Sequence, residues 1–396
     1  MREFSEQVLA AETSNLVSGA RVVDVLEEMK HDHYEGFVGL DVHKDTIAVA
    51  IAYRGRAKPT YLKEIKNTPS AIVKLVGQLS EHGEALLFCY EAGPCGYVVW
   101  RQILDLGQDC EVVAPPGSEQ IKTDRRDALR LSRLLRAGEL RCVWVPDVEQ
   151  EAMRDLARCR SDFKGQQHKA RQQLNAFVLR QGHHWNGKSR WTLAHYAWLE
   201  SLQFAHDWQV LVRNEYLEAV REANARVEQM TQELSRALPA WSLAPVVQSL
   251  MALRGVDQLA AITILSELGD ITRFDSPKQL MGFLGLVPSL HSSGNRRRQG
   301  SITLAGNRHA RRILIESAWT YRFAARQTPH LKRKAKNASE ESKRIAWRAQ
   351  KRLCGRYRAL TEAGKNQKIV CVAIARELIG FIWDIVRQEM PKVRVA

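Results

Sequence analysis

Three short strands, followed by alternating helices and strands, leave residues 36–138 few possible folds. The runs GFVGLDV and TIAVAIAY are rich in β-branched residues and flank the turn His43-Lys44-Asp45, which predicts a β-hairpin. The run ALLFCYE has no polar alternation and predicts a buried strand. The other expected elements are strands at PTYLKEI and at 110–115, and helices at about 70–81, 96–106 and 123–138. This β-β-β-α-β-α-β-α order predicts an α/β layered domain with a mixed sheet.

The remaining chain has a helical pattern. Apolar residues between Val220 and Ala237 recur at steps of three and four. This indicates either a coiled-coil-like hairpin with a helix at about 155–181 or ordinary helix packing in one core. Pro239 and Pro245 mark a further boundary. The expected domains are a helical leader at 1–35, an α/β domain at 36–148, a helical linker at 149–238 and a mainly α C-terminal domain at 239–396.

Four acidic residues lie at the ends of these elements. Asp41 closes the first strand, Glu91 closes the buried strand, and Asp124 and Asp127 begin a helix. Functional groups collect beyond the carboxyl ends of adjacent parallel strands, and residues i and i+3 share a helix face. Four carboxylates brought together in this way repel one another unless cations bind them. Mg²⁺ suits oxygen ligands, and two such ions could serve a phosphoryl transfer. Each acid taken alone is more often a turn or cap residue.

Positive charge is concentrated in one segment. The chain has 59 Lys and Arg against 44 Asp and Glu, and residues 290–360 hold 19 of the basic residues with 3 acidic ones. This asymmetry indicates a polyanionic partner, and nucleic acid is the first candidate because neutralised phosphates release counterions. Hydrophobic residues make up 45% and charged residues 26%, which excludes a largely disordered chain, a collagen-like fibre and a small disulfide scaffold.

Cysteine usage and hydropathy bear on the compartment. The seven cysteines are irregularly spaced and include no C-x-x-C motif, which favours reduced thiols over disulfides or a zinc site. The sequence starts without a signal-peptide pattern, and no apolar run approaches the ~18 residues that span a bilayer. We therefore expect a cytoplasmic protein with no membrane partner.

Local strings resemble a family of mobile-element enzymes. GLDVHKDT, YEAGPCGY and KTDRRDALRLSRLLRAGEL, in this order, resemble the DEDD domain of insertion sequence 110 family transposases, which are related to Piv-type DNA invertases. The stretch from GVDQLAAITI to RRILIESAW resembles the second domain of that family. The resemblance implies an RNase H/RuvC-like domain with Asp41, Glu91, Asp124 and Asp127 as Mg²⁺ ligands, Mn²⁺ being a substitute. It also implies a serine nucleophile, a noncoding bridge RNA that pairs with double-stranded donor and target DNA, and homodimers that assemble into tetramers.

The family serine precedes a basic stretch, which assigns it to Ser293, with Ser292 one residue away as the alternative. A serine hydroxyl needs activation and an offset of the phosphate charge before it attacks. Gly306 would allow the backbone to approach a sugar–phosphate chain closely. Trp347 and Tyr357 are candidates for stacking on bases. The basic residues expected at phosphates are Arg296, Arg297, Arg298, Arg308, Arg311, Arg312, Lys332, Arg333 and Lys334.

Two other functions fit the same residues. A RuvC-like Holliday-junction resolvase or invertase would use the four acids with water and would need no RNA. A nucleic-acid-binding regulator would retain the basic segment without catalysis, although the presence of all four acids argues against it. The segment LRGVDQLAAITI resembles a helix-hairpin-helix, but Asp257 replaces its second glycine, so the turn has either a packing role or a phosphate contact.

Overall fold

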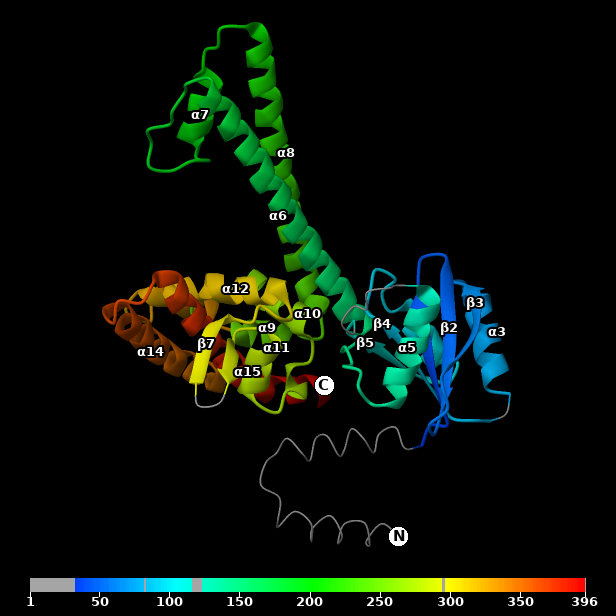
Figure 1. Cartoon of the computed structure of the whole chain (residues 1–396). Helices are drawn as coiled ribbons and strands as arrows, with labels where there is room; N and C mark the ends of the chain where they lie inside the picture. Colours follow the sequence, from blue (N-terminus) through cyan, green and yellow to red (C-terminus); the bar gives the residue numbers. More distant parts are fainter. Residues whose placement is uncertain (1–32, 82, 116–122, 294–295, 396) are drawn as a thin grey trace. The chain divides into compact units, whose positions relative to one another are not determined.

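The chain forms two compact units, Met1–Val145 and Pro146–Ala396. The computed structural model describes residues 33–81, 83–115, 123–293 and 296–395 (Figure 1). The expected helical leader at 1–35 therefore lies outside the described residues except for its last three. Within the described ranges, no helix combines the length and the apolar composition that crossing a membrane requires.

The first unit is a five-stranded mixed sheet in the order β3-β2-β1-β4-β5. Its elements are β1 (Gly36–Val42), β2 (Thr46–Tyr53), β3 (Thr60–Lys66), α3 (Pro69–Leu79), β4 (Leu86–Glu91), α4 (Val98–Asp105), β5 (Asp109–Val113) and α5 (Asp124–Arg136). Strands β1, β2 and β3 pair antiparallel, whereas β4 runs parallel to β1 and β5 runs parallel to β4. The predicted element order and the mixed sheet are both confirmed.

Helices cover both faces of the sheet because its strands are apolar on both sides. On one face, Val38 and Phe88 pack against Ile72 of α3 and Ile103 of α4. On the other face, apolar side chains of β1 and β4 pack against Leu131 and Leu135 of α5. Helix α5 therefore covers the face of the sheet opposite to α3 and α4.

Gly39 allows α5 to lie directly on β1. A Cβ atom at this position would overlap the backbone oxygen of Ala128 and lie 2.5 Å from the backbone nitrogen of Ser132. Ala48 and Ala50 of β2 pack with Ala128 in the same place, so small side chains line this contact. The sequence thus sets a short distance between the helix backbone and the sheet.

The second unit begins with a long helical hairpin made of α6 (Val148–Arg180) and α8 (Asp207–Ala237). Leu217, Val220, Val227 and Leu234 are the buried apolar residues of α8, and their spacing keeps one face of the helix against α6. Helix α7 (Leu193–Ser201) packs at the far end of this hairpin, as Figure 1 shows. Of the two arrangements that the sequence left open, the structure shows the helical hairpin.

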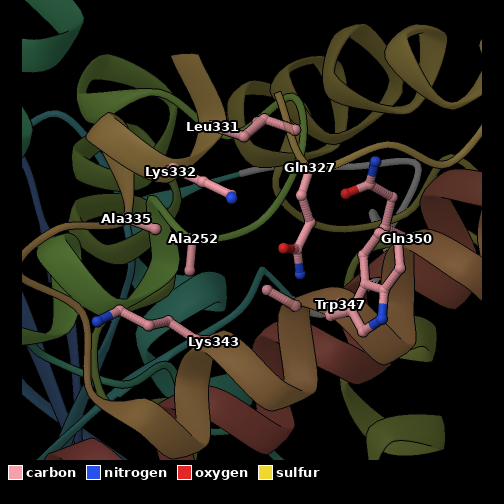
Figure 2. Close-up of a pocket in the computed structure, with 9 residues that line it drawn as sticks. Ala252, Gln327, Leu331, Lys332, Ala335, Lys343, Trp347 and Gln350 are labelled. Atoms are coloured by element: carbon pink, nitrogen blue, oxygen red, sulfur yellow. The ribbon is translucent and has the colours of Figure 1, made fainter. Parts of the chain in front are cut away.

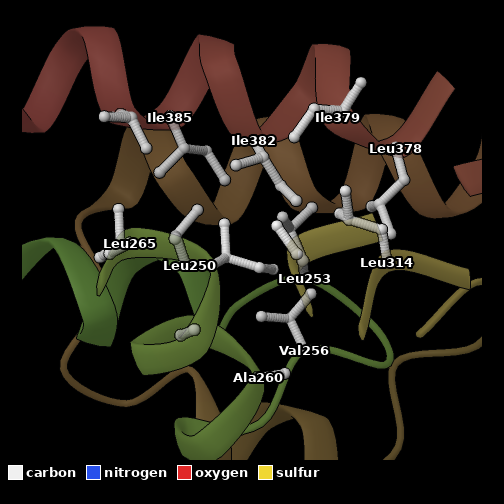
Figure 3. Packing of buried hydrophobic residues seen from close by; sticks show 14 of the residues in the cluster. Leu250, Leu253, Val256, Ala260, Leu265, Leu314, Leu378, Ile379, Ile382 and Ile385 are labelled. Carbon is white, nitrogen blue, oxygen red and sulfur yellow. The ribbon is translucent and has the colours of Figure 1, made fainter. Parts of the chain in front are cut away.

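The rest of the second unit is mainly helical around one large core. Its elements are η3 (Leu238–Ala240), α9 (Ala244–Leu250), α10 (Gln258–Leu268), η4 (Ile271–Arg273), α11 (Pro277–Phe283), β6 (Pro288–Ser293), β7 (Arg296–Ile302), α12 (Arg308–Ala318), η5 (Trp319–Arg322), α13 (Pro329–Lys334), α14 (Glu340–Glu362) and α15 (Gln367–Val395). Leu378, Ile382 and Ile385 of α15 pack against Leu250 and Leu265 (Figure 3). The C-terminal domain is mainly α, as expected, but the β6/β7 hairpin was not predicted, because PSLHSS and RRRQGSI lack the apolar alternation by which a strand is recognised.

Candidate active site

Asp41 and Glu91 end two strands that lie side by side. In the parallel pairing of β1 with β4, Gly39 is opposite Cys89 and Leu40 is opposite Tyr90. Asp41 and Glu91 are the next residue on each strand. Side chains of a strand alternate between faces, and Phe37 and Cys89, which share the phase of these acids, face α5. Both carboxylates therefore belong to the face of the sheet that α5 covers.

The first turn of α5 brings two more acids to this face. Thr123 caps the helix by accepting a hydrogen bond from the backbone N–H of Arg126, and Asp124 and Asp127 follow in the first turn. At the other end of the helix, Arg136 donates hydrogen bonds to the carbonyls of Tyr53 and Ala57, at 2.9 and 2.7 Å. The helix is thus fixed along its length, which fixes the position of its acidic turn.

His43 lies between two of the four acids, and sequence reasoning did not identify it as a site residue. Its Nε2 atom is 3.2 Å from Oδ2 of Asp41 and 3.6 Å from Oδ1 of Asp124. Asn67 holds the turn by donating from Nδ2 to the carbonyl of His43 at 2.8 Å. The available signal was the Asp-x-His spacing at a strand end, but a histidine beside Lys44 and Asp45 also suits a solvated turn.

Electrostatics indicate how closely the acids approach one another. Burial raises the pKa of Asp41; His43 acts in the opposite direction, and the charges of Asp124 and Asp127 raise it further. One ligand atom from each of Asp41, His43 and Asp124 lies within 4.8 Å of the others, a spacing that one metal ion could bridge. Carboxylate oxygens with mutual repulsion are a donor set that fits a hard divalent cation. Glu91 is brought to the same edge by strand register.

The expected serine lies in the second unit. Ser293 is the last residue of β6, and its partner across the β6/β7 hairpin is Arg296. Ser292 pairs with Arg297. Two serines and the three consecutive arginines at 296–298 therefore belong to one two-stranded ribbon. The serines and arginines, which are close in sequence, are thus opposite one another across the two strands.

Arg311 and Gly306 fix the base of this ribbon. Arg311 is buried, and its Nη1 donates to the carbonyl of Leu284, before β6, at 2.9 Å and to that of Ala305, after β7, at 2.7 Å. Gly306 has φ of +69°, and a Cβ atom there would overlap the carbonyl oxygen of Phe283. These positions give both residues a structural role, and the phosphate contacts expected of them have no support from their placement.

The other arginines of α12 remain accessible. Arg308 is exposed. Arg312 is exposed as well, and it donates to the hydroxyl of Ser161 at 3.1 Å and lies 3.9 Å from Glu316. The phosphate contacts expected of these two arginines stay predictions, and the exposure of both side chains is compatible with them.

Lys334 also has a structural role. Its Nζ donates to the carbonyls of Leu253 and Val256, at 2.8 and 2.7 Å, in the turn between α9 and α10. Burial lowers the pKa of Lys334 to about 8, although the charge of Asp257 acts in the opposite direction. Asp257 itself caps α10 by accepting from the N–H of Ala260. The turn that resembles a helix-hairpin-helix thus uses its polar groups internally, which favours the packing role. Lys332 and Arg333 are exposed, as a phosphate contact requires.

Three arginines of α14 pair with acidic residues of α15. Arg348 bonds Asp384 at 2.9 Å, and Arg352 and Arg356 bond Glu377 at 2.8 and 3.5 Å. Tyr357, a candidate for stacking, is buried in the core, whereas Trp347 is half-buried. Of the two aromatic candidates, Trp347 alone retains a ring face that a ligand could reach.

Two family models match the chain. The model of the IS110-type DEDD domain, described as a transposase, matches residues 38–183. The model described as the transposase IS116/IS110/IS902 family matches residues 247–335. The first match contains the four acids and His43, and the second contains the β6/β7 hairpin and the two serines.

Similar proteins extend the likeness to the whole chain. A protein of Sinorhizobium fredii with the provisional name transposase y4qE is 42% identical over 394 residues, which cover 98% of this chain and 96% of that protein. The transposase for insertion sequence element IS1533 of Leptospira borgpetersenii is 29% identical over 295 residues, 72% of this chain and 85% of its own length. The chain therefore belongs to the IS116/IS110/IS902 family and is a transposase, an enzyme of mobile-element DNA recombination.

Proposed function

We propose that this transposase breaks and rejoins DNA strands through the hydroxyl of Ser293, assisted by a metal site made of Asp41, Glu91, Asp124 and Asp127. The observation that carries the proposal is the close approach of Asp41, His43 and Asp124, which each place one ligand atom within 4.8 Å of the others. Such a cluster favours a bound cation, with two Mg²⁺ ions expected per site and Mn²⁺ as a substitute. When bound, the metal offsets the negative charge of the phosphate.

The chain's own residues perform the bond exchange. Attack of the Ser293 oxygen on a DNA phosphorus forms a serine–phosphate bond, and the DNA hydroxyl that leaves takes up the proton released by the serine. Attack by another DNA hydroxyl then breaks the serine bond and joins the strands. Arg296, Arg297 and Arg298 are proposed to donate hydrogen bonds to the phosphate oxygens, a geometry that guanidinium groups suit.

Recognition of DNA is proposed to use a guide. A noncoding bridge RNA would pair with the donor and target DNA, and dimers that assemble into tetramers would hold the strands to be exchanged. The basic segment at 290–360 supports a polyanionic partner, and relatives are named as transposases for insertion sequence elements. We propose that the chain divides into three domains that serve this reaction. They are a RuvC-like domain at 36–148, a helical linker at 149–238 and a C-terminal domain at 239–396. Recombination between donor and target plasmids should stop when the noncoding segment beside the gene is deleted.

A denaturing gel tests the nucleophile. Wild-type protein with labelled DNA and Mg²⁺ should yield a covalent protein–DNA adduct, whereas Ser293→Ala should bind DNA normally and yield none. Ser292→Ala is the matched control, because it removes the same hydroxyl one residue away. An adduct lost only in Ser292→Ala would move the nucleophile to that position, and an adduct that persists in the double variant would exclude a serine route at this motif.

Complementation tests how the two residue sets combine. Ser293 belongs to the second unit and Asp124 to the first. If a site draws on two subunits, mixing inactive Ser293→Ala with inactive Asp124→Ala should restore a minority of active sites. No recovery in oligomers proven to be mixed would mean that each chain completes its own site.

One observation favours a second candidate, hydrolysis by water. Asp41, His43 and Asp124 come together within the first unit alone, without a residue from the second. A resolvase or invertase that uses water would cut DNA with these acids and leave no protein attached. Cleavage that survives in the Ser292→Ala, Ser293→Ala double variant, without an adduct, would favour this route.

A further inference from the structure

A cavity of about 270 Å³ opens in the second unit between α13 and α14. Pockets for small molecules measure ~300–1,000 Å³. This cavity lies just below that range, so it suits one small planar group and not a larger molecule. Figure 2 shows Leu331 and Lys332 on the α13 side and Trp347 and Gln350 on α14. Gln327 enters from the segment that precedes α13.

Trp347 supplies an aromatic wall. Its side chain is half-buried, so the indole is held in place while part of it remains accessible. The ammonium of Lys351 lies 5.8 Å from the centre of the ring, a cation–π distance that further orients it. Indole rings stack on nucleobases with little regard to sequence, because every base has a π face.

Two carboxamides line the same cavity. Gln350 is 5% exposed, and its Nε2 donates to the carbonyl of Arg326 at 2.8 Å, which fixes the orientation of its amide group. The amide of Gln327 extends between Lys332 and Trp347 in Figure 2. A carboxamide offers both a donor and an acceptor, which are the groups that the edge of a nucleobase also presents.

The charge at the cavity is positive. Lys332 and Lys343 line it, and no acidic residue does so among the residues that the structure describes. Lys343 bonds the exposed Glu340 at 2.8 Å, which partly offsets its charge. No described carboxylate forms an ion pair with Lys332, so its ammonium can bind an anionic group of a ligand.

We propose that this cavity binds one unpaired nucleotide of a single-stranded nucleic acid. The base stacks on Trp347, Gln327 and Gln350 contact its edge, and Lys332 binds the adjoining phosphate. The site uses none of the carboxylates of the first unit and does not depend on the strand-cleavage chemistry. RNA and single-stranded DNA share the chemistry that the cavity recognises, so the experiment has an arm for each.

Photocrosslinking locates the base. Full-length protein is irradiated, without divalent metal, in complex with single-stranded RNA containing 5-iodouridine or with the same DNA sequence containing 5-iodo-deoxyuridine. These bases crosslink to the aromatic ring on which they stack. Digestion after Lys and Arg isolates Trp347 in the short peptide at 345–348. We expect a crosslink on this peptide, and the nucleic acid that gives the higher yield, RNA or single-stranded DNA, is the one that the cavity prefers. The absence of a crosslink on this peptide with both nucleic acids would overturn the proposal.

Binding affinities supply the matched variants. Trp347→Ala should weaken single-strand binding about 10-fold, within the effect of losing one stacked base, and Trp347→Phe should restore part of it. Trp208→Ala removes an exposed indole from α8 and should change nothing. Melting temperatures close to that of the wild type verify that the variants fold. Equal weakening by Trp347→Ala and Trp208→Ala, or no weakening by either, would contradict the proposal.

Two lysine variants that lose the same charge test the proposed phosphate contact of Lys332. Lys332→Gln and Lys336→Gln each remove one positive charge from the same exposed stretch, but only Lys332 lines the cavity. Replacing the central base by an abasic site should weaken binding to the wild type and to Lys336→Gln, and weaken it less in Trp347→Ala. Lys332→Gln should lose more affinity than Lys336→Gln. Identical losses in the two lysine variants would exclude a phosphate contact by Lys332.

Discussion

Arg158 and Glu267 form a two-pronged ion pair that joins α6 to α10, with N–O distances of 2.7 and 2.8 Å. The Glu267 side chain is 1% exposed. It also accepts a hydrogen bond, at 2.6 Å, from Nδ2 of Asn307, which caps α12. One buried carboxylate therefore connects three helices and fixes the base of the long hairpin to the C-terminal core. Burial raises the pKa of Glu267, but the bonds from Arg158 and Asn307 outweigh it and hold the pKa below its ordinary value.

Removing Arg158 should destabilise the protein. Arg158→Ala leaves the buried carboxylate with Asn307 alone, so we expect a loss of about 3–5 kcal/mol in the free energy of unfolding, measured in urea. Arg236→Ala removes an arginine that is 75% exposed and should cost no more than ~0.5 kcal/mol. A carboxyl with a lowered folded pKa stabilises the protein above its unfolded pKa of about 4.3. The difference in free energy of unfolding between wild type and Arg158→Ala should therefore narrow as the pH falls below about 4. Equal urea midpoints for the two proteins at pH 7 would mean that the ion pair between Arg158 and Glu267 does not stabilise the fold.

Asp41 should destabilise the metal-free protein. A carboxyl whose pKa is raised on folding contributes stability at low pH, and that contribution is lost as the pH rises through the folded pKa. Without divalent ions at pH 7, Asp41→Asn should therefore melt above the wild type, by roughly 2 °C. Added Mg²⁺ should raise the melting temperature of the wild type more than that of the variant. Asp45→Asn, an exposed acid in the same turn, is the control in scanning fluorimetry. A variant that melts below the wild type would contradict the repulsion.

The four acids should each be needed for cleavage. Alanine at Asp41, Glu91, Asp124 or Asp127 should abolish cutting of DNA in Mg²⁺ while circular dichroism remains that of the folded protein, because each carboxylate is a proposed ligand of a shared site. His43→Ala should reduce cutting less, since the imidazole bridges Asp41 and Asp124 without replacing them. Normal cutting by three of the four alanine variants would remove the site from this edge of the sheet.

Salt dependence should distinguish the arginines of the β6/β7 hairpin from the arginines of α14 that pair with α15. Changing Arg296, Arg297 and Arg298 to Gln should reduce the slope of log affinity against log salt by about 1 for each phosphate that the variant no longer binds. The same changes at Arg348, Arg352 and Arg356 remove equal charge from residues already bonded to α15, so the slope should change less. Fluorescence anisotropy with labelled DNA at several salt concentrations provides the slopes. A slope in the 296–298 variant equal to that of the wild type would mean that the hairpin arginines do not bind phosphates.

The base of the β6/β7 hairpin should tolerate no side chain at 306. Gly182 and Gly306 both have φ near +70 to +80°, but only a Cβ at 306 meets another group, the carbonyl of Phe283. Gly182→Ala should therefore cost about 1 kcal/mol for the left-handed backbone, and Gly306→Ala roughly 1–3 kcal/mol more for the overlap. Thermal unfolding measures both. Equal losses would mean that Phe283 moves aside without cost.

Sequence alone predicted which elements of the first unit carry the four acids, because the determinants of these elements are local. The strands of the first unit are apolar runs bounded by turns, and Asp124 follows a capping threonine, so both the elements and their ends could be located. The prediction required β1 and β4 to be adjacent and parallel, which the sequence did not establish and the sheet register shows. His43 was missed because its importance comes from the distance to Asp124, which lies 81 positions further along the chain and is set by α5.

The roles of the basic residues were harder to predict, because a residue's charge does not indicate whether its side chain points into the core or to solvent. Arg311 and Arg312 are neighbours in sequence, yet one is buried against two carbonyls and the other is exposed. Lys334 differs from Lys332 in the same way. Which member of such a pair faces inward depends on the phase of a short helix and on the carbonyls left unpaired by turns elsewhere, neither of which a single sequence displays.

The missing side chain at Gly39 has a consequence for engineering the acidic site. Asp41 belongs to β1 and Asp124 to α5, so the width of the space between them depends on how closely that helix backbone approaches that strand. Gly39 is where the two backbones meet, and a methyl group there would have to displace the backbone at Ala128 and Ser132. Enlarging this one residue would therefore widen the space between Asp41 and Asp124 without replacing any of the four acids. Such a variant would separate the effect of spacing on catalysis from the effect of charge.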